Sequence, residues 1–232
     1  MDKGLDKGLK KEAGTNPPYS DCALTEFLRQ QAIQRIQRIQ RIQREEQIVQ
    51  IPRSHAWQAA MMQAKKVEVL LLDVDGVLTD GTLFYAGVSE EIKVFNTLDG
   101  FGLRLLHDAG IAVGLITARS SEAVSRRAKE LKLEYVVTGC RNKRDAYCTL
   151  LAEQGWQPEQ TAYMGDDWLD LPVLTQVGCS FAPANAVAEI CYQVDYVTEK
   201  SGGHGAVREV AELILEAKGL LAGLLSRYMQ TA

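Results

Sequence analysis

The stretch from residue 67 to 76, VEVLLLDVDG, constrains the fold more than any other part of the chain. An almost continuous apolar run that ends in acidic residues is typical of a strand buried on both faces of a parallel sheet. Further strand-like runs follow, separated by segments with helical periodicity, at residues 111–117, 134–139, 162–166 and 179–184. This alternation predicts an α/β fold with an open, mainly parallel sheet, right-handed crossovers and helices on both faces.

The segments between these strands predict the remaining elements. Residues 81–95 have the pattern of a β-hairpin, and the helix after it ends at Gly110. Another helix begins at Ser120 or Ser121 and places its apolar residues on one face. Helices are also expected near 142–154 and 168–176, and one long apolar helix over 206–225 closes the chain.

Residues 1–66 differ from the rest in charge and complexity. They carry 12 Lys and Arg against 7 Asp and Glu, whereas residues 67–232 carry 14 against 23. The repeat QRIQRIQRIQR places an isoleucine at every third position, so successive isoleucines are rotated by about 60° around a helix instead of forming one seam. We predict a low-complexity basic extension at 1–66, disordered or loosely helical, and a folded domain at 67–232. A short basic helix that binds a membrane surface or nucleic acid is the alternative.

The composition restricts the class of protein. No apolar run approaches the roughly 20 residues that a membrane span needs, and the first 18 residues lack the apolar segment of a signal peptide. Five cysteines form no CxxC pair, which favours reduced thiols in a cytoplasmic protein. The acidic part repels anions, so we expect no nucleic-acid partner for it, and an anionic substrate would need local positive charge or a metal.

An acidic pair follows the most apolar strand. Asp73 and Asp75 lie two residues apart, and burying such carboxylates without partners would cost several kcal/mol. One of them can act as nucleophile and metal ligand while the other transfers protons. Gly76 then permits a tight backbone turn. Alone, this pattern is weak, because many such pairs are turn residues.

Two other predicted strands also end in polar residues. Thr117 offers a hydroxyl to phosphate oxygens, and Arg119 adds a guanidinium fork, although a helix cap is the commoner use of such a threonine. Residues 165–170 hold three carboxylates, which a shared cation such as Mg²⁺ would stabilise. Lys143 opens a predicted helix and could neutralise a phosphoryl group. The carboxyl ends of parallel strands form ligand sites, so the conjunction predicts a phosphoryl-transfer site.

These motifs resemble those of the haloacid dehalogenase-like (HAD) superfamily of phosphatases. DVDGVLTD matches the first motif, LITAR the second, Lys143 the third and GDDWLD the fourth, over residues 67–220. Further stretches, among them EEIKVFNTLDGFGLR and DYVTEKSGGHGAVRE, resemble a capless subfamily that hydrolyses 3-deoxy-D-manno-octulosonate 8-phosphate in lipopolysaccharide synthesis. The resemblance implies a Rossmann-like sheet with a small hairpin flap and no cap domain. Only about 25 residues separate Asp75 from the helix start at Asp99, too few for a cap.

The resemblance also implies roles for the catalytic residues. Asp73 would attack phosphorus and form an aspartyl-phosphate. Asp75 would protonate the leaving oxygen and then activate water. Thr117 and Lys143 would bind the transferred phosphoryl oxygens.

The same resemblance implies a Mg²⁺ site. Its ligands would be the Asp73 carboxylate, the Asp75 backbone carbonyl and Asp166. Asp167 and Asp170 would support these ligands and orient Lys143.

Substrate contacts and partners are implied as well. The implied substrate-binding residues are Asp75, Asn96, Thr97, Leu98, Asp99, Gly100, Arg104, Arg119, Arg127 and Lys143. Arginines suit the carboxylate of a sugar acid, although Arg104 and Arg127 could equally lie on a solvated helix face. Members of this subfamily close their sites as homotetramers. An N-acylneuraminate 9-phosphate substrate and a catalytically silent scaffold remain as alternatives.

Overall fold

The computed structural model describes residues 21–48, 52–86 and 91–230. The chain divides into two units, Met1–Gln47 and Ile48–Ala232. Residues 1–20 of the predicted extension lie outside the described part, so the prediction for them stays a prediction.

The described residues of the first unit, from Asp21 on, form helix α1 (Asp21–Ile48), whose last residue lies just past the unit boundary. The four isoleucines of the triplet repeat, Ile33, Ile36, Ile39 and Ile42, are each between 44% and 54% exposed. Their rotation around the helix leaves no continuous apolar stripe, as the three-residue period predicts. No helix in the part of the chain that the structure describes, α1 included, is long and apolar enough to cross a bilayer.

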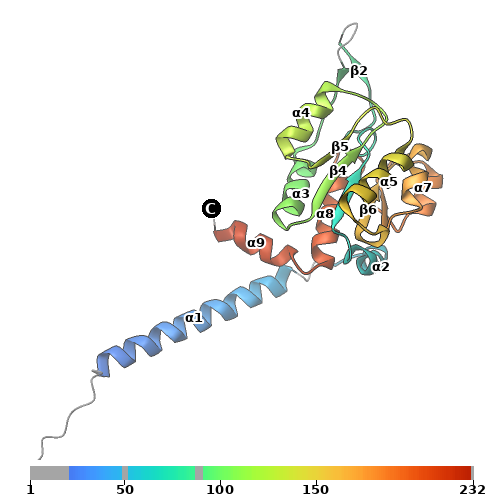
Figure 1. Cartoon of the computed structure of the whole chain (residues 1–232). Coiled ribbons are helices and arrows are strands. Elements are labelled where there is room, and N and C mark those ends of the chain that lie inside the picture. The colour runs from blue at the N-terminus through green and yellow to red at the C-terminus, as the bar shows by residue number, and fades with distance from the viewer. Residues whose placement is uncertain (1–20, 49–51, 87–90, 231–232) are drawn as a thin grey trace, which may run out of the picture. The chain divides into compact units, whose positions relative to one another are not determined.

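The second unit is built on a six-stranded sheet in the order β5-β4-β1-β6-β7-β8, and every adjacent pair is parallel (Figure 1). The strands are β1 (Val69–Leu72), β4 (Ala112–Ile116), β5 (Tyr135–Val137), β6 (Thr161–Met164), β7 (Cys179–Ala182) and β8 (Tyr196–Val197). The chain extends the sheet from β1 through β4 to β5 and then crosses to β6 on the other side of β1. The carboxyl end of β1 therefore lies at a topological switch point.

Helices cover both faces of this sheet, which confirms the predicted fold class. The elements of one face are α2 (His55–Ala64), α3 (Thr97–Asp108), α4 (Glu122–Leu131) and α8 (Ala206–Ala217). The elements of the other face are α5 (Lys143–Gln154), α6 (Leu171–Leu174) and α7 (Ala188–Gln193). Leu70 and Leu72 of β1 enter the first core, and Val69 and Leu71 enter the second. This two-sided burial explains why the sequence of β1 is continuously apolar instead of alternating.

The compact unit begins earlier than residue 67, where the sequence pattern placed its start. The Ser54 side chain caps α2 by accepting a hydrogen bond from the backbone N–H of Trp57, at 3.1 Å. Trp57 is only 3% exposed and packs edge-on against Tyr196, with 5.8 Å between ring centroids. The short apolar stripe of α2, which also includes Ala60 and Ala64, is thus part of the core.

Between β1 and α3 the structure contains a two-stranded antiparallel hairpin, β2 (Phe84–Tyr85) and β3 (Glu91–Ile92), and no cap domain among the residues described there. Both the hairpin and the missing cap agree with the sequence prediction. The long C-terminal helix that we expected is instead two helices, α8 and α9 (Leu221–Gln230). Gly219 lies between them with φ of +70°, a left-handed conformation that ends the first helix. Short 3₁₀ turns, η1 (Pro158–Gln160) and η2 (Trp168–Asp170), complete the unit.

Candidate active site

The structure brings the polar ends of three strands to one edge of the sheet. Leu72 at the end of β1 pairs with Leu115 of β4 on one side and with Met164 of β6 on the other. The residues that follow these strands, Asp73, Thr117 and the 165–170 segment, therefore lie side by side. The backbone N–H of Asp73 also donates to the carbonyl of Met164 at 3.0 Å, which fixes the start of the loop after β1.

Lys143 joins this cluster from the first turn of α5. Asn142 caps that helix through its side chain, so the local sequence holds the start of α5 in place. The Lys143 Nζ lies 2.8 Å from Asp73 Oδ2 and 2.6 Å from Asp170 Oδ1. Burial by itself lowers the pKa of Lys143, but the charges of Asp170 and Asp73 outweigh burial and raise this pKa above its ordinary value. Lys143 therefore remains a cation at neutral pH.

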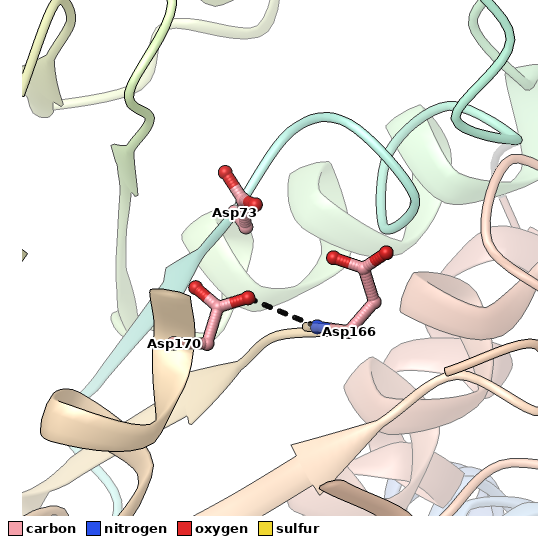
Figure 2. Close-up of side chains that lie close together, drawn as sticks. All are labelled: Asp73, Asp166 and Asp170. Carbon is pink, nitrogen blue, oxygen red and sulfur yellow. Dashed lines mark hydrogen bonds between the residues drawn. The ribbon is translucent and has the colours of Figure 1, made fainter. Parts of the chain in front are cut away.

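Asp170 lies beside Asp73 and Asp166 (Figure 2), is fully buried, and is the hub of the cluster's hydrogen bonds. Its Oδ1 accepts hydrogen bonds from Lys143 Nζ and from the hydroxyl of Tyr163, both at 2.6 Å. Its Oδ2 accepts from the backbone N–H groups of Asp166 at 3.0 Å and Asp167 at 3.4 Å. Four donors satisfy the buried carboxylate and fix the loop after β6. Sequence reasoning missed Tyr163, whose only signal was a hydroxyl within a mostly apolar strand.

The exposed side of the loop after β6 is shaped by Asp167 and carries two large apolar side chains. Asp167 accepts from the backbone N–H of Trp168 at 2.7 Å and caps η2, so its side chain shapes the loop. Trp168 is 60% exposed and Leu169 is 66% exposed. Two large apolar side chains thus face outward directly beside the carboxylate cluster.

The carboxylates of Asp73, Asp166 and Asp170 suit a hard cation, since one oxygen from each lies within 4.8 Å of the others. Burial, with the charge of Asp170 added and that of Lys143 opposing, raises the pKa of Asp73 to about 6. Burial and the neighbouring carboxylates raise the pKa of Asp166 to about 7. A bound cation would relieve this repulsion, so the donor set fits Mg²⁺. Because Asp170 already accepts four hydrogen bonds, Asp73 and Asp166 are the members of this carboxylate cluster whose oxygens can bind the cation.

Gly76 makes room for this arrangement. Its φ of +81° is left-handed, and a Cβ at this position would overlap the Asp166 carboxylate, with only 2.5 Å to Cγ. The turn after the acidic pair therefore needs glycine for two reasons, its backbone conformation and its contact with Asp166.

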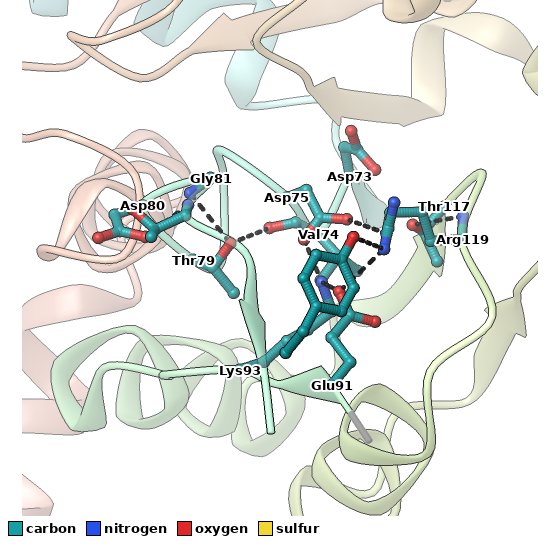
Figure 3. Close-up of polar contacts among 12 residues, drawn as sticks. Asp73, Val74, Asp75, Thr79, Asp80, Gly81, Glu91, Lys93, Thr117 and Arg119 are labelled. Carbon is teal, nitrogen blue, oxygen red and sulfur yellow. Dashed lines mark hydrogen bonds and ion pairs between the residues drawn. The ribbon is translucent and has the colours of Figure 1, made fainter. Parts of the chain in front are cut away.

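Asp75, on the same turn, faces the hairpin (Figure 3). Its carboxylate forms an ion pair with Lys93, just after β3, and its Oδ2 lies 3.7 Å from Arg119 Nε. Arg119 also donates to Glu91 and to the Tyr85 hydroxyl, at 3.2 and 3.3 Å. The expected Arg119 is thus present beside Asp75, whereas Lys93 and Glu91 were not predicted, since nothing in their local pattern distinguishes them from other hairpin charges.

Of the predicted substrate segment, Asn96 and Asp99 mainly hold elements together. Asn96 caps α3 by accepting from the Leu98 N–H at 2.8 Å. The Asp99 carboxylate is 1% exposed and accepts from the backbone N–H groups of Gly205 at 3.2 Å and Arg208 at 2.9 Å, at the start of α8. Burial raises the pKa of Asp99 above its ordinary value. Thr97 opens α3, and Leu98 is 56% exposed.

The two other predicted arginines have different surroundings. Arg127 Nη2 donates to the Asn96 carbonyl at 3.4 Å and packs beside Gly100, where a Cβ would lie 3.2 Å from its Cζ. Arg104 lies on the exposed side of α3. A hydrogen bond thus links the side chain of Arg127 to Asn96, just before α3. Among the described residues, Arg104 makes no such bond.

Several sequence relatives of the chain share one activity in their names. A haloacid dehalogenase-like hydrolase family matches residues 136–210. The 3-deoxy-D-manno-octulosonate 8-phosphate phosphatase of Yersinia pestis is 43% identical over 163 residues, which cover 70% of this chain and 87% of that protein. The chain belongs to the 3-deoxy-D-manno-octulosonate 8-phosphate phosphatase family. The enzyme of Escherichia coli K12 is similar, with 42% identity over 68% of this chain and 85% of that protein.

Solved structures of this phosphatase family have the same fold. The Yersinia pestis phosphatase superimposes with a TM-score of 0.70 at 42% identity, over 71% of this chain and 89% of that chain. The Moraxella catarrhalis phosphatase, solved with magnesium ion, phosphate ion and a KDO molecule, gives a TM-score of 0.71 at 37% identity, over 73% of this chain and 97% of that chain. The resemblance noted in the sequence is thereby confirmed.

Proposed function

We propose that this chain is a Mg²⁺-dependent phosphatase that hydrolyses 3-deoxy-D-manno-octulosonate 8-phosphate to the sugar acid and phosphate, a step of lipopolysaccharide precursor synthesis. The observation that carries the proposal is the convergence of Asp73, Asp75, Thr117, Lys143 and the Asp170 hub at the carboxyl edge of the sheet. Family membership over most of the length of its relatives supports the choice of substrate.

In the first half-reaction, an Asp73 oxygen forms a bond to phosphorus while the bond from phosphorus to the sugar oxygen breaks. The sugar oxygen takes the bonding electrons and a proton from Asp75. In the second half-reaction, Asp75 removes a proton from water as the water oxygen bonds to phosphorus, and Asp73 leaves as a carboxylate. Lys143 and the Thr117 hydroxyl balance the charge on the transferred phosphoryl oxygens.

Mg²⁺ would be held by the Asp73 and Asp166 carboxylates and by the Asp75 carbonyl. When bound, the ion neutralises charge on the phosphoryl group and between the clustered carboxylates. Asp170 contributes by orienting Lys143 and the backbone of the loop after β6, and Asp167 by capping η2.

The sugar-acid end of the substrate is expected at the start of α3. Thr97, Leu98 and the backbone around Asp99 and Gly100 would line it, with Asn96 fixing the helix start. Arg104, Arg119 and Arg127 are the candidate partners of the substrate carboxylate. If an arginine binds this carboxylate, its replacement by alanine will raise KM more than it lowers kcat. An unchanged KM would show that this arginine does not bind the substrate.

The homotetramer expected for capless members is also part of the proposal. The hairpin and its flanks expose five large apolar side chains by 39% to 67%: Leu83, Phe84, Tyr85, Ile92 and Val94. Together with Trp168 and Leu169, they offer an apolar surface that a neighbouring subunit would cover. Light scattering should give four times the 25.6 kDa chain mass, and a monomeric mass at micromolar concentration would refute this.

A cytoplasmic location fits the thiol chemistry. Cys140, Cys148, Cys179 and Cys191 are free, and burial raises the pKa of Cys179 well above its ordinary value, which keeps it an inert thiol. Cell fractionation tests this, and recovery in a membrane or exported fraction would contradict it.

The function is tested by phosphate release from a panel of sugar-acid phosphates, with Mg²⁺ and with chelator, for the wild type and Asp73→Asn. We expect preferred hydrolysis of 3-deoxy-D-manno-octulosonate 8-phosphate that chelator or the substitution abolishes. Preference for an N-acylneuraminate 9-phosphate would refute the substrate and keep the mechanism. Silence of the wild type on the whole panel would refute both and favour a scaffold.

A further inference from the structure

Four charged side chains of alternating sign, one of them the acid–base residue Asp75, form a closed ring of ion pairs (Figure 3). Lys93 is ion-paired with Asp75 and lies 3.0 Å from Glu91 Oε1. Glu91 in turn lies 3.2 Å from Arg119 Nη2, and Arg119 Nε lies 3.7 Å from the second oxygen of Asp75. Both oxygens of the Asp75 carboxylate therefore face a cation, one supplied by the hairpin and one by the loop after β4.

The burial of this ring shows which member is under most constraint. The side chain of Lys93 is 1% exposed, compared with 14% for Glu91, 23% for Asp75 and 42% for Arg119. A buried ammonium is tolerated only when it is paired, and here two carboxylates share it. Lys93 is thus held between the hairpin strand and Asp75, with little freedom to swing into water.

We propose that Lys93 and Glu91 are positioning residues for the phosphatase reaction, because they hold the Asp75 carboxylate where it can exchange a proton with the leaving sugar oxygen. Lys93 holds one Asp75 oxygen directly, and Glu91 holds Lys93 and Arg119 in place. Proton transfer is thereby linked to the position of the hairpin. This inference rests on the proposed function of Asp75 and adds two residues that act through it.

The proposal predicts a dependence on the leaving group. A sugar alkoxide is a poor leaving group and needs the proton that Asp75 supplies as the P–O bond breaks. A p-nitrophenolate leaves readily without one. A residue that only positions Asp75 therefore matters for the sugar phosphate and little for p-nitrophenyl phosphate, whereas a residue that binds the phosphoryl group or holds the fold matters for both.

The experiment compares kcat/KM on both substrates for the full-length Mg²⁺ enzyme, since kcat/KM reports the steps up to release of the first product. Lys93→Met should lose about 10–100-fold on the sugar phosphate, a typical result of misplacing a reacting group. It should lose no more than about 3-fold on the aryl phosphate, as expected when the affected proton transfer is not needed. Lys129→Met, which removes an exposed lysine of α4, is the control and should leave both values near those of the wild type.

Two further variants keep the test decisive. Glu91→Gln is a smaller change and should repeat the pattern with about a 3–10-fold loss on the sugar phosphate alone, even where Lys93→Met folds poorly. In an Asp75→Asn background, Lys93→Met should change kcat/KM by less than about 2-fold, because residues that act as a unit are non-additive.

Equal losses on both substrates, or additive losses with Asp75→Asn, would overturn the positioning role. If the wild type hydrolyses a different sugar phosphate, the proposed substrate fails, but the same ratio measured with that substrate still tests Lys93 and Glu91.

Discussion

Gly76 links the acidic pair after β1 to Asp166, the proposed metal ligand after β6, so its replacement by alanine tests the geometry of the site. Its φ of +81° is unfavourable for any residue with a Cβ, and that Cβ would overlap Asp166. Gly81 offers a matched control in the same loop, because its φ is +84° but a Cβ there would have its nearest neighbour 3.6 Å away. The two substitutions share the backbone strain and differ in the contact with Asp166.

The backbone strain costs about 1–2 kcal/mol for a non-glycine residue in the left-handed region, so we expect similar losses of unfolding free energy from Gly76→Ala and Gly81→Ala. The overlap with Asp166 is an additional effect, and either the carboxylate or the turn must move. Displacing groups that hold or orient a metal ligand typically costs about 10–100-fold in metal affinity, or about 1.4–2.8 kcal/mol. Of the two variants, only Gly76→Ala should therefore require about 10–100-fold more Mg²⁺ for half-maximal activity.

Phosphate release measured against Mg²⁺ concentration gives the half-saturating value for each variant, and urea unfolding with chelator gives the shared strain. We expect the two variants to agree in the second measurement and to differ in the first. Equal Mg²⁺ requirements for Gly76→Ala and Gly81→Ala would refute the reasoning, since they would mean that Asp166 does not need the space beside Gly76.

Two other perturbations test the core and the charge cluster. Trp57→Ala should lower the unfolding free energy by about 3–5 kcal/mol, because the ring is buried in the core, whereas Met62→Ala, at a side chain that is 76% exposed, should stay within about 0.5 kcal/mol. Urea unfolding measures both, and a loss below about 1 kcal/mol for Trp57→Ala would remove α2 from the core. Burial raises the pKa of Asp73 to about 6 and of Asp166 to about 7, from 3.8, so between about pH 4 and 7 the metal-free folded protein binds more protons than the unfolded chain. In the presence of chelator, the protein should lose the contribution of these groups to stability as the pH rises through this window. The increase in Tm that Mg²⁺ produces should therefore become larger with pH. An increase in Tm that does not change with pH would contradict the assignment of this cluster as the metal site.

The N-terminal boundary illustrates a limit of sequence patterns. The sequence pattern assigns residues 52–66 to the basic extension, because the first strand-like run begins at residue 67. In the structure, α2 is amphipathic over only three turns, and Trp57 is buried in a core where its ring packs at 90° to that of Tyr196, far along the chain. Such a short stripe is recognisable only when its partner is known. Similarly, the break between α8 and α9 depends on a single glycine that helical periodicity alone does not distinguish.

The sequence by itself determined the parallel sheet and the main catalytic candidates. The continuous apolar run of β1 requires burial on both faces, and strand ends in a parallel sheet must share an edge, so Asp73, Thr117 and Asp166 could be grouped before any coordinates. Only the tertiary structure decided that Tyr163 joins Lys143 on Asp170, that Asp99 secures α8, and that Lys93 and Glu91 lie beside Asp75 and Arg119. The physical reason is that periodicity and strand ends are local properties of the chain. Hydrogen bonds and ion pairs between distant elements depend on distances that exist only after those elements have packed.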